Sequence, residues 1–190
     1  ILGPQVTGYK IWEMNMKLNS KQLRDLPERE AKSSLAGLPR MPIYFIVENV
    51  YDTYNVGGLF RLADALNVSK IYLCGETETP PNHKIVKASI GTYKIVPWEY
   101  KSSAKEAIHA LRSTIHALRV LAVEQSKGSV DYRKANYSLP LALIVGNETS
   151  GVTEETLKLC DQIVEIPMLG VNTSLNVIVS AAIVGYQATT

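Results

Sequence analysis

The residues best placed to do chemistry lie near the C-terminus, where polar side chains adjoin short apolar runs. The segment 146–148, Gly-Asn-Glu, follows the apolar run 141–145, and Ser174 and Asn176 stand in front of the apolar stretch 177–184. A short apolar run that ends in glycine is typical of a buried strand, and Ser174 is a candidate N-cap of the last helix. Because strand ends and helix N-termini meet at one edge of an α/β sheet, we expect a ligand site there.

A second polar group lies earlier in the chain, where Asn55 directly precedes a helical pattern at 56–66 and Arg61 lies inside it. Asn55 is a candidate helix cap. Arg61 falls two turns into the helix among apolar residues, close to the end of the preceding strand. An ion pair with Asp52 or Asp64 is the alternative to a role for Arg61 in a ligand site.

From residue 42 onward, apolar β-rich runs alternate with amphipathic stretches. This alternation predicts an α/β fold with a mostly parallel sheet covered by helices on both faces. The predicted strands are 43–47, 70–74, 94–96, 119–123, 141–145 and 163–166. The predicted helices are 20–26, 56–66, a short one within 80–91, one from Ser103 with an apolar face reaching Leu118, one after Thr153, and 175–187.

Several familiar kinds of site are not supported by the spacing of residues. There is no Gly-x-Gly dinucleotide fingerprint, no phosphate-binding Gly-x4-Gly-Lys-Ser/Thr loop and no Gly-x-Ser-x-Gly elbow. His83, His109 and His116 are scattered, and an exposed helix face explains the last two better than a metal site. Cys74 and Cys160 have no metal spacing, so packing as free thiols is the simpler interpretation.

Length and composition are those of one ordinary globular domain. The 190 residues carry a net charge of +2 with 46% hydrophobic residues, which neither proves nor excludes a nucleic-acid partner. No apolar run approaches the ~18 residues that span a membrane, and no signal-peptide pattern is visible, so we expect a cytoplasmic protein. Residues 1–41 are interpreted as an N-terminal arm and not an independent domain, and 42–190 as the domain.

Three separated motifs occur in an order that resembles the SpoU/TrmH branch of the SPOUT RNA methyltransferases. The first is Asn55 with Arg61 six positions later. The second is the segment 141–151, Leu-Ala-Leu-Ile-Val-Gly-Asn-Glu-Thr-Ser-Gly, and the third combines 166–170, Ile-Pro-Met-Leu-Gly, with 174–177, Ser-Leu-Asn-Val. A lone Gly-Asn-Glu would be weak evidence, whereas three motifs in order are specific.

The resemblance covers roughly 42–190 and implies a fold, an activity and partners. The fold would be Rossmann-like with a C-terminal deep trefoil knot, a rare exception among proteins. The activity would be methylation of a ribose 2′-hydroxyl in tRNA or rRNA with S-adenosyl-L-methionine (AdoMet) and no metal. The short arm favours tRNA slightly. A second subunit would complete the site, and the almost wholly apolar last helix independently predicts a homodimer.

The resemblance also implies roles for particular residues. Those matching the family's catalytic and structural polar positions are Asn55, Arg61, Glu148, Ser174 and Asn176. Those expected around the cofactor are Val123, Glu124, Gly146, Ile166, Met168, Gly170 and Leu175. One departure is mild: Asn172-Thr173 stands where an acidic residue is common in the family.

Arg61 is expected to act on the RNA and not as a general base. An arginine pKa above ~12 makes Arg61 awkward in the role of base. We expect Arg61 instead to clamp the phosphate beside the target ribose, with a phosphate oxygen or water taking the proton. The sequence leaves the identity of the base open.

Two other functions compete with this hypothesis. One is a noncatalytic RNA-binding protein that retains the fold, against which the intact motif residues count. The other is an oxidoreductase that binds NAD, which the missing Gly-x-Gly spacing opposes.

Overall fold

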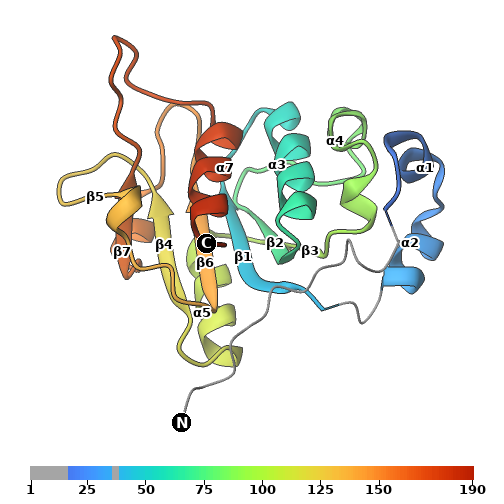
Figure 1. Cartoon of the computed structure of the whole chain (residues 1–190), viewed down its shortest axis with the longest axis horizontal. Coiled ribbons are helices and arrows are strands. Elements are labelled where there is room, and N and C mark those ends of the chain that lie inside the picture. Colours follow the sequence, from blue (N-terminus) through green and yellow to red (C-terminus); the bar gives the residue numbers. More distant parts are fainter. Residues whose placement is uncertain (1–16, 36–38) are drawn as a thin grey trace.

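The structure, a computed structural model, describes residues 17–35 and 39–190. Its elements follow one another as in Figure 1: α1 (Ser20–Asp25), α2 (Glu28–Leu35), β1 (Met41–Glu48), α3 (Thr53–Ala65), β2 (Val68–Cys74), α4 (His83–Ser89), η2 (Thr92–Lys94), β3 (Trp98–Lys101), α5 (Ala104–Thr114), β4 (Arg119–Val123), β5 (Val130–Asp131), η3 (Tyr132–Lys134), β6 (Leu141–Val145), α6 (Glu154–Leu157), β7 (Gln162–Glu165) and α7 (Val177–Gln187). The first part of the expected arm therefore lies outside the described residues.

The strands form one seven-stranded sheet in the order β3-β2-β1-β6-β4-β7-β5, and each described pair is parallel. The predicted parallel sheet is confirmed. β6 has all five residues buried, as expected for a strand covered on both sides. Because all strands run the same way, their carboxyl ends share one edge of the sheet.

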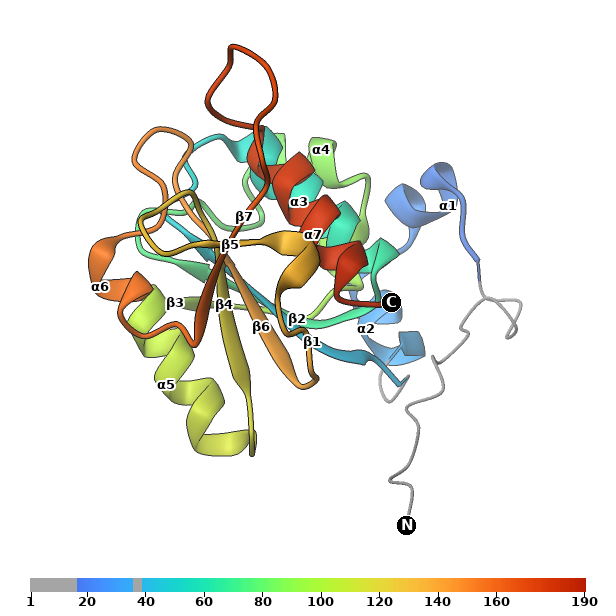
Figure 2. The ribbon, with the colours of Figure 1, turned by 60° about the vertical axis from the view of Figure 1, so that its left-hand side comes forward.

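Helices cover both faces of the sheet, as Figure 2 shows. Side chains alternate between the two faces along each strand. On β1, Phe45 packs into the core beneath α3 and α7, and Ile46 packs into the core beneath α5. In the described part of the chain, no helix is long and apolar enough to cross a membrane.

The strand predicted at 94–96 is wrong. Gly91 takes the left-handed conformation with φ 98° and starts a tight turn that becomes the 3₁₀ helix η2. The amide groups of Lys94, Ile95 and Val96 donate to the carbonyls of residues 91 and 92. They are therefore not available for hydrogen bonds to a neighbouring strand. The edge strand β3 begins only after Pro97. The three residues 94–96, one basic and two apolar, are compatible in sequence with either a short strand or a 3₁₀ turn.

Two predicted helix caps are also wrong. The N-cap of α3 is Asp52, whose side chain accepts from the Tyr54 amide, so Asn55 lies inside the first turn. The N-cap of α7 is Asn176, whose side chain accepts from the Ile178 amide at 2.9 Å, and Ser174 lies two residues before it. Both shifts free the side chain that the sequence had assigned to capping. Similarly, α5 ends at Thr114, before the last residues of its predicted apolar face.

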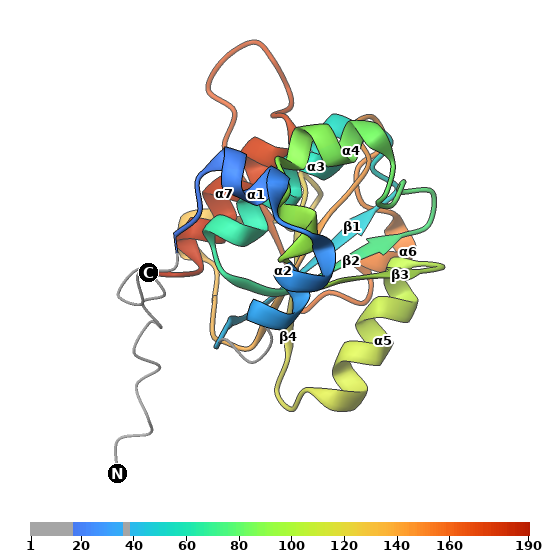
Figure 3. The same cartoon turned by 90° about the vertical axis from the view of Figure 1, so that its right-hand side faces the viewer.

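The N-terminal helices are docked on the domain, beside α4, as Figure 3 shows. The ammonium of Lys94 donates to the carbonyls of Arg24 and Leu26, each at 2.8 Å, and so satisfies groups at the C-terminal end of α1. Leu23 is buried, and its carbonyl lies against Gly91 so closely that a Cβ there would collide with it. The helix predicted at 20–26 is confirmed as α1, whereas α2 was not predicted.

Candidate functional site

A cavity of about 390 Å³ opens at the carboxyl edge of the sheet, where β4, β6 and β7 end. This is the position at which open parallel sheets bind ligands. Its lining comes from segments far apart in the chain: Val123, Glu124, Gln125, Val145, Gly146, Asn147, Glu148, Thr149, Gly151, Val164, Glu165, Ile166, Met168, Asn172, Ser174, Leu175, Asn176, Val177 and Ser180.

Most residues expected around a cofactor line this cavity. Of that group, only Gly170 does not, and a Cβ on Gly170 would meet open space. Of the five residues expected to be catalytic or polar structural positions, Glu148, Ser174 and Asn176 line the cavity, whereas Asn55 and Arg61 do not.

The loop 146–151 is folded back on itself. Asn147 pairs with Gly151 through two backbone hydrogen bonds, and its side-chain oxygen accepts from the amides of Thr149 and Ser150. A Cβ on Gly146 would overlap the backbone of Gly151. Gly146 is therefore required by the packing of its own loop.

Glu124 ties the end of β4 to the same loop. One of its oxygens accepts from the Val152 amide at 2.9 Å and the other from the Gln125 amide at 2.8 Å. Gly151 has φ 69°, and a Cβ there would strike the Glu124 carboxylate. Glu124 therefore positions the loop in addition to lining the cavity.

Three polar side chains, Glu148, Asn55 and Asn176, form a continuous chain of hydrogen bonds beside the cavity. The Asn55 amide nitrogen donates to Glu148 Oε1 at 2.9 Å, and Asn55 Oδ1 accepts from Asn176 Nδ2 at 3.0 Å. The orientation of the Asn55 amide follows from its partners. An ionised carboxylate can only accept, so the Asn55 nitrogen must face Glu148 and the Asn55 oxygen must face the Asn176 nitrogen. Asn176 is then left with its own oxygen for capping α7. All three sequence motifs meet in this chain.

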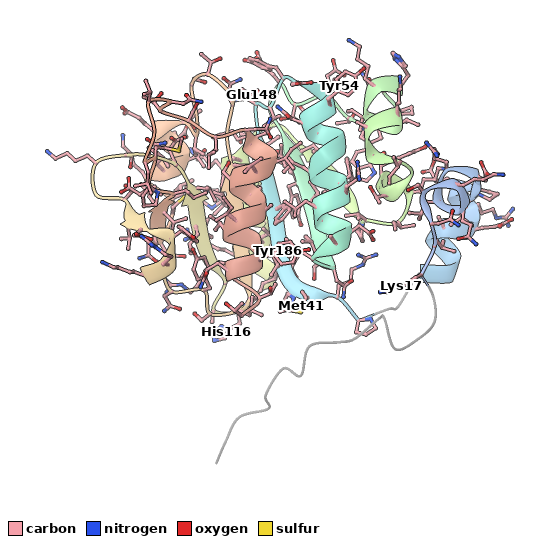
Figure 4. The ribbon with its side chains drawn as sticks, turned by 45° about the horizontal axis from the view of Figure 1, so that its top comes forward. Lys17, Met41, Tyr54, His116, Glu148 and Tyr186 are labelled. Carbon is pink, nitrogen blue, oxygen red and sulfur yellow. The ribbon has the colours of Figure 1, made fainter. Side chains whose placement is uncertain are left out.

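Glu148 receives two further hydrogen bonds, from the backbone amides of Tyr51 and Asp52, both at 3.2 Å. Burial alone would raise the pKa of Glu148, but the hydrogen bonds from Asn55, from these two amides and from its own backbone amide outweigh burial and lower the pKa. Glu148 is therefore anionic at neutral pH. Figure 4 shows Glu148 and Tyr54 at one end of the molecule and His116 at the other.

The segment 166–176 forms a loop that protrudes beyond the cavity, as Figure 1 shows. Gln125 donates to the Thr173 carbonyl at 2.7 Å and so holds one limb of the loop near β4. Met168 and Leu175 face the cavity, whereas Leu169 and Val171 are almost completely exposed.

Arg61 lies outside the cavity, on the exposed side of α3. Arg61 follows Asn55 by six positions, which is about 9 Å along a helix. The Arg61 side chain forms no hydrogen bond or ion pair with another described residue, so the alternative of an ion pair with Asp52 or Asp64 is not formed. Its role in a site stays a prediction.

Sequence reasoning missed several residues of the cavity, notably Gln125, Glu165 and Ser180. Glu165 is the last residue of β7 and accepts from the Ser129 hydroxyl at 2.6 Å. Position at a strand end could have drawn attention to Glu165. Ser180 lies one helical turn after Asn176, a spacing that places both on one face of α7.

A family model described as the SpoU rRNA methylase family matches residues 42–186, which is most of the chain. This chain belongs to the SpoU rRNA methylase family. The three motifs on which the resemblance was based all lie inside the matched range, and two of them supply much of the lining of the cavity.

This SpoU family member is similar in sequence to two tRNA (guanosine(18)-2′-O)-methyltransferases. The protein from Escherichia coli is 30% identical over 142 residues, which are 75% of this chain and 60% of that protein. The protein from Thermus thermophilus is 32% identical over 143 residues, 75% of this chain and 72% of that protein. This chain thus spans only about 60% of the length of the E. coli relative.

Two solved structures illustrate the likeness in fold. An AdoMet-bound rRNA methyltransferase from Sinorhizobium meliloti superposes with a TM-score of 0.73 at 30% identity, covering 87% of this chain and 59% of that one. A TrmH/SpoU tRNA-modifying enzyme from A. aeolicus gives a TM-score of 0.71 at 27% identity, covering 89% and 80%. The α/β architecture inferred from the sequence is therefore that of the family.

Proposed function

We propose that this protein is an AdoMet-dependent RNA methyltransferase that methylates a ribose 2′-hydroxyl, with tRNA as the favoured substrate, and that it works in the cytoplasm. The observation that carries the proposal is the cavity at the carboxyl edge of the sheet, which the motif segments build and which holds three carboxylates. The names of the relatives favour tRNA, and AdoMet is bound in one solved relative.

The residues of the cavity fit AdoMet in size and charge. A volume of about 390 Å³ lies within the range of ~300–1,000 Å³ usual for small-molecule sites. Apolar side chains such as Val145, Ile166 and Leu175 suit a flat base. Glu124, Glu148 and Glu165 contribute carboxylates, and the described residues that line the cavity include no lysine, arginine or histidine. This lining favours a cationic ligand and disfavours a diphosphate such as NAD.

AdoMet supplies, when bound, a methyl group activated by its sulfonium centre. The protein must then hold the target ribose in line and neutralise charge on the RNA. Arg61 would clamp the phosphate beside the target ribose through its planar guanidinium. The Glu148–Asn55–Asn176 chain would keep the loop 146–151 and the start of α7 in register around the cavity.

We also propose that the protein is a homodimer through α7. Val179 and Tyr186 on this helix are 45% and 53% exposed, and in a single chain their apolar surface stays in water. The position of Arg61 outside the cavity of its own chain supports a site that a second subunit completes.

A trefoil knot in the C-terminal part belongs to the same proposal. In the sheet order, β6 lies between β1 and β4, and β7 lies between β4 and β5. This interleaving, together with the bond from Gln125 to the loop 166–176, supports a threaded arrangement of these segments.

The decisive experiment is methylation of total tRNA and total rRNA with radiolabelled AdoMet, followed by digestion and nucleoside mapping. The expected product is a 2′-O-methylated nucleoside, more abundant in tRNA. Calorimetry should show binding of AdoMet and no binding of NAD. Binding of NAD without AdoMet would contradict the proposal, and binding of AdoMet and RNA without transfer would instead favour a noncatalytic RNA-binding protein.

A further inference from the structure

The exposed side of the helix layer that contains α3, α4 and α1 is rich in cations. The helix α4 has the sequence His-Lys-Ile-Val-Lys-Ala-Ser, with no acidic residue, and Lys84 and Lys87 are both exposed. Arg61 is exposed on α3, and Lys21 and Arg24 are exposed on α1. None of these five cations forms a hydrogen bond or ion pair through its side chain with another described residue. We call these five residues the α1–α4 surface.

Packing contacts show that Arg61 faces outward between two neighbouring helices. Gly57 lies against Ala88 of α4, and Gly58 lies against Ile178 of α7. At about 100° per residue, Arg61 points roughly 40° from the direction of Gly57 and roughly 60° from that of Gly58. Arg61 therefore projects between α4 and α7, on the solvent side of the layer.

The same reasoning places the lysines of α4 beside Arg61. Ile85 is buried and Ala88 faces α3. Viewed down the axis of α4, Lys84 lies about 40° from Ala88, on the side away from the buried Ile85. Lys87 lies about 160° from Ile85, almost on the opposite side of the helix. Both lysines therefore lie on the solvent side, and Lys84 is the nearer to α3.

The surface continues from α4 to α1 without a gap in the packing. The turn that follows α4 carries Gly91 and Lys94, and both contact the end of α1. Figure 1 shows α3, α4 and α1 side by side. With packed helices about 8–10 Å apart, the cations span roughly 20 Å.

On α5, which packs on the opposite face of the sheet, the cations are neutralised. Lys105 pairs with Glu155 at 2.7 Å, and Arg112 pairs with Asp161 at 3.3 Å. The unpaired charge of the α1–α4 surface is therefore not a general property of the helices. Unpaired lysines and arginines on one face are the electrostatic signature of a polyanion site.

We propose that the α1–α4 surface binds the phosphate backbone of the substrate RNA on its way to the cavity. This inference rests on the proposed function and adds to it a docking surface beyond the target nucleotide. A span of roughly 20 Å matches about six nucleotides of one strand of a duplex, at ~3.4 Å of helix axis per nucleotide. The contacts are to phosphates, so they set affinity and register and not base preference.

The test uses the double variant Lys84→Gln/Lys87→Gln and the matched control Lys105→Gln/Lys158→Gln, which removes the same charge from α5 and from the C-cap of α6. Binding of fluorescently labelled, unfractionated tRNA is measured by anisotropy from about 50 to about 200 mM salt. The α4 variant should bind about tenfold more weakly at low salt, and its plot of log affinity against log salt should flatten by about 1.4–1.8, because each phosphate contact contributes ~0.7–0.9. AdoMet affinity should be unchanged, and the control should bind tRNA like the wild type.

Three outcomes would overturn the inference. The first is an unchanged affinity and salt slope in Lys84→Gln/Lys87→Gln while the wild type still methylates RNA, which leaves the proposed function standing. The second is an equal loss in the control variant. The third is unchanged tRNA binding with loss of binding to phosphatidylserine–phosphatidylcholine vesicles, which would identify a membrane surface. A wild type that binds AdoMet but neither binds nor methylates RNA would refute the proposed function itself.

Discussion

At the scale of single residues, the chain Glu148–Asn55–Asn176 joins the three sequence motifs. Asn55 is only 6% exposed, yet both ends of its amide are used. Burial of the Asn55 amide would destabilise the folded state unless both Glu148 and Asn176 were present to bond with it. Glu148, Asn55 and Asn176 therefore hold the site together whatever their part in the chemistry.

The first prediction concerns Asn55. Asn55→Leu leaves the Asn176 amide nitrogen without its acceptor and removes one of the two hydrogen bonds to Glu148 Oε1, which keeps only the Asp52 amide, and this should cost about 1–3 kcal/mol of unfolding free energy. For a chain of this size the melting temperature should fall by about 2–4 °C per kcal/mol. Thermal unfolding of Asn55→Leu measures the effect, with Tyr54→Leu at the neighbouring exposed position as control. Equal stability of the two variants would show that the hydrogen bonds joining Glu148, Asn55 and Asn176 do not stabilise the fold.

The second prediction concerns the charge of Glu148. Because the folded protein lowers its pKa, the folded state binds fewer protons than the unfolded state near pH 4. The stabilisation is complete above the unfolded pKa of about 4.3 and is lost as the pH falls through the lower folded pKa. The difference in unfolding free energy between wild type and Glu148→Gln should therefore shrink on acidification. Denaturant titrations from neutral to acid pH measure it, and a difference that grows toward low pH would contradict the assignment.

The third prediction concerns Arg61. Arg61→Ala should lower turnover by about a hundredfold or more, the scale of a lost transition-state contact, while AdoMet affinity stays nearly unchanged. Arg61→Lys should remain impaired, because lysine keeps the charge but not the planar two-point fork. Single-turnover kinetics with labelled AdoMet provide the measurement. Wild-type turnover in Arg61→Ala would remove Arg61 from the reaction.

At the scale of elements, α3 connects the site to the helix layer. Its N-terminal turn carries Asn55, and its two glycines allow α4 and α7 to approach closely. A Cβ on Gly57 would press on Ala88 and on the backbone of α4. The position of the site therefore depends on helix packing several residues away.

The fourth prediction tests this packing. Alanine is favoured over glycine in a helix by about 1 kcal/mol, so Gly57→Ala would stabilise an isolated α3. The clash with α4 should outweigh this gain, since overpacking costs about 1–3 kcal/mol. Denaturant unfolding should show Gly57→Ala to be less stable than the wild type and Gly170→Ala, where the added methyl meets open space, to be nearly neutral. A stabilised Gly57→Ala would mean that α3 and α4 can separate at little cost.

At the scale of the whole molecule, two exposed features lie in the helix layer around the site. The α1–α4 surface is cationic, and α7 exposes apolar side chains next to α3. The different chemistry of the two surfaces fits two partners, RNA on one and a second copy of the chain on the other.

The fifth prediction concerns assembly through α7. Light scattering should give about 42 kDa, twice the chain mass of 21.0 kDa. Val179→Glu places a charge on the exposed part of α7 and should give about 21 kDa with the fold retained, because a charge is tolerated in water but not in an apolar interface. Leu18→Glu, at a residue that is 41% exposed on another part of the molecule, serves as control and should stay dimeric. A wild type of single-chain mass at micromolar concentration would refute the dimer.

The sequence alone predicts the α/β class, most strands and a candidate site at strand ends, where the structure has its cavity. It could do so because burial on both faces produces continuous apolar runs, such as the one at 141–145, and because turn residues must follow them. It also determined the family, since the order of motifs along the chain is a property of sequence alone.

The contacts of the polar residues, by contrast, depend on the tertiary structure. Asn55 bonds to partners 93 and 121 positions away, and those distances close only when β6 lies beside β1 in the sheet. Gly146 is required by the backbone of its own loop, and Glu165 joins the cavity because β7 lies beside β4. Local propensity carries no information about such long-range neighbours. The sequence alone therefore does not show that Asn55 bonds to distant side chains instead of capping a helix, that Gly146 is required by its own loop, or that Glu165 lines the cavity.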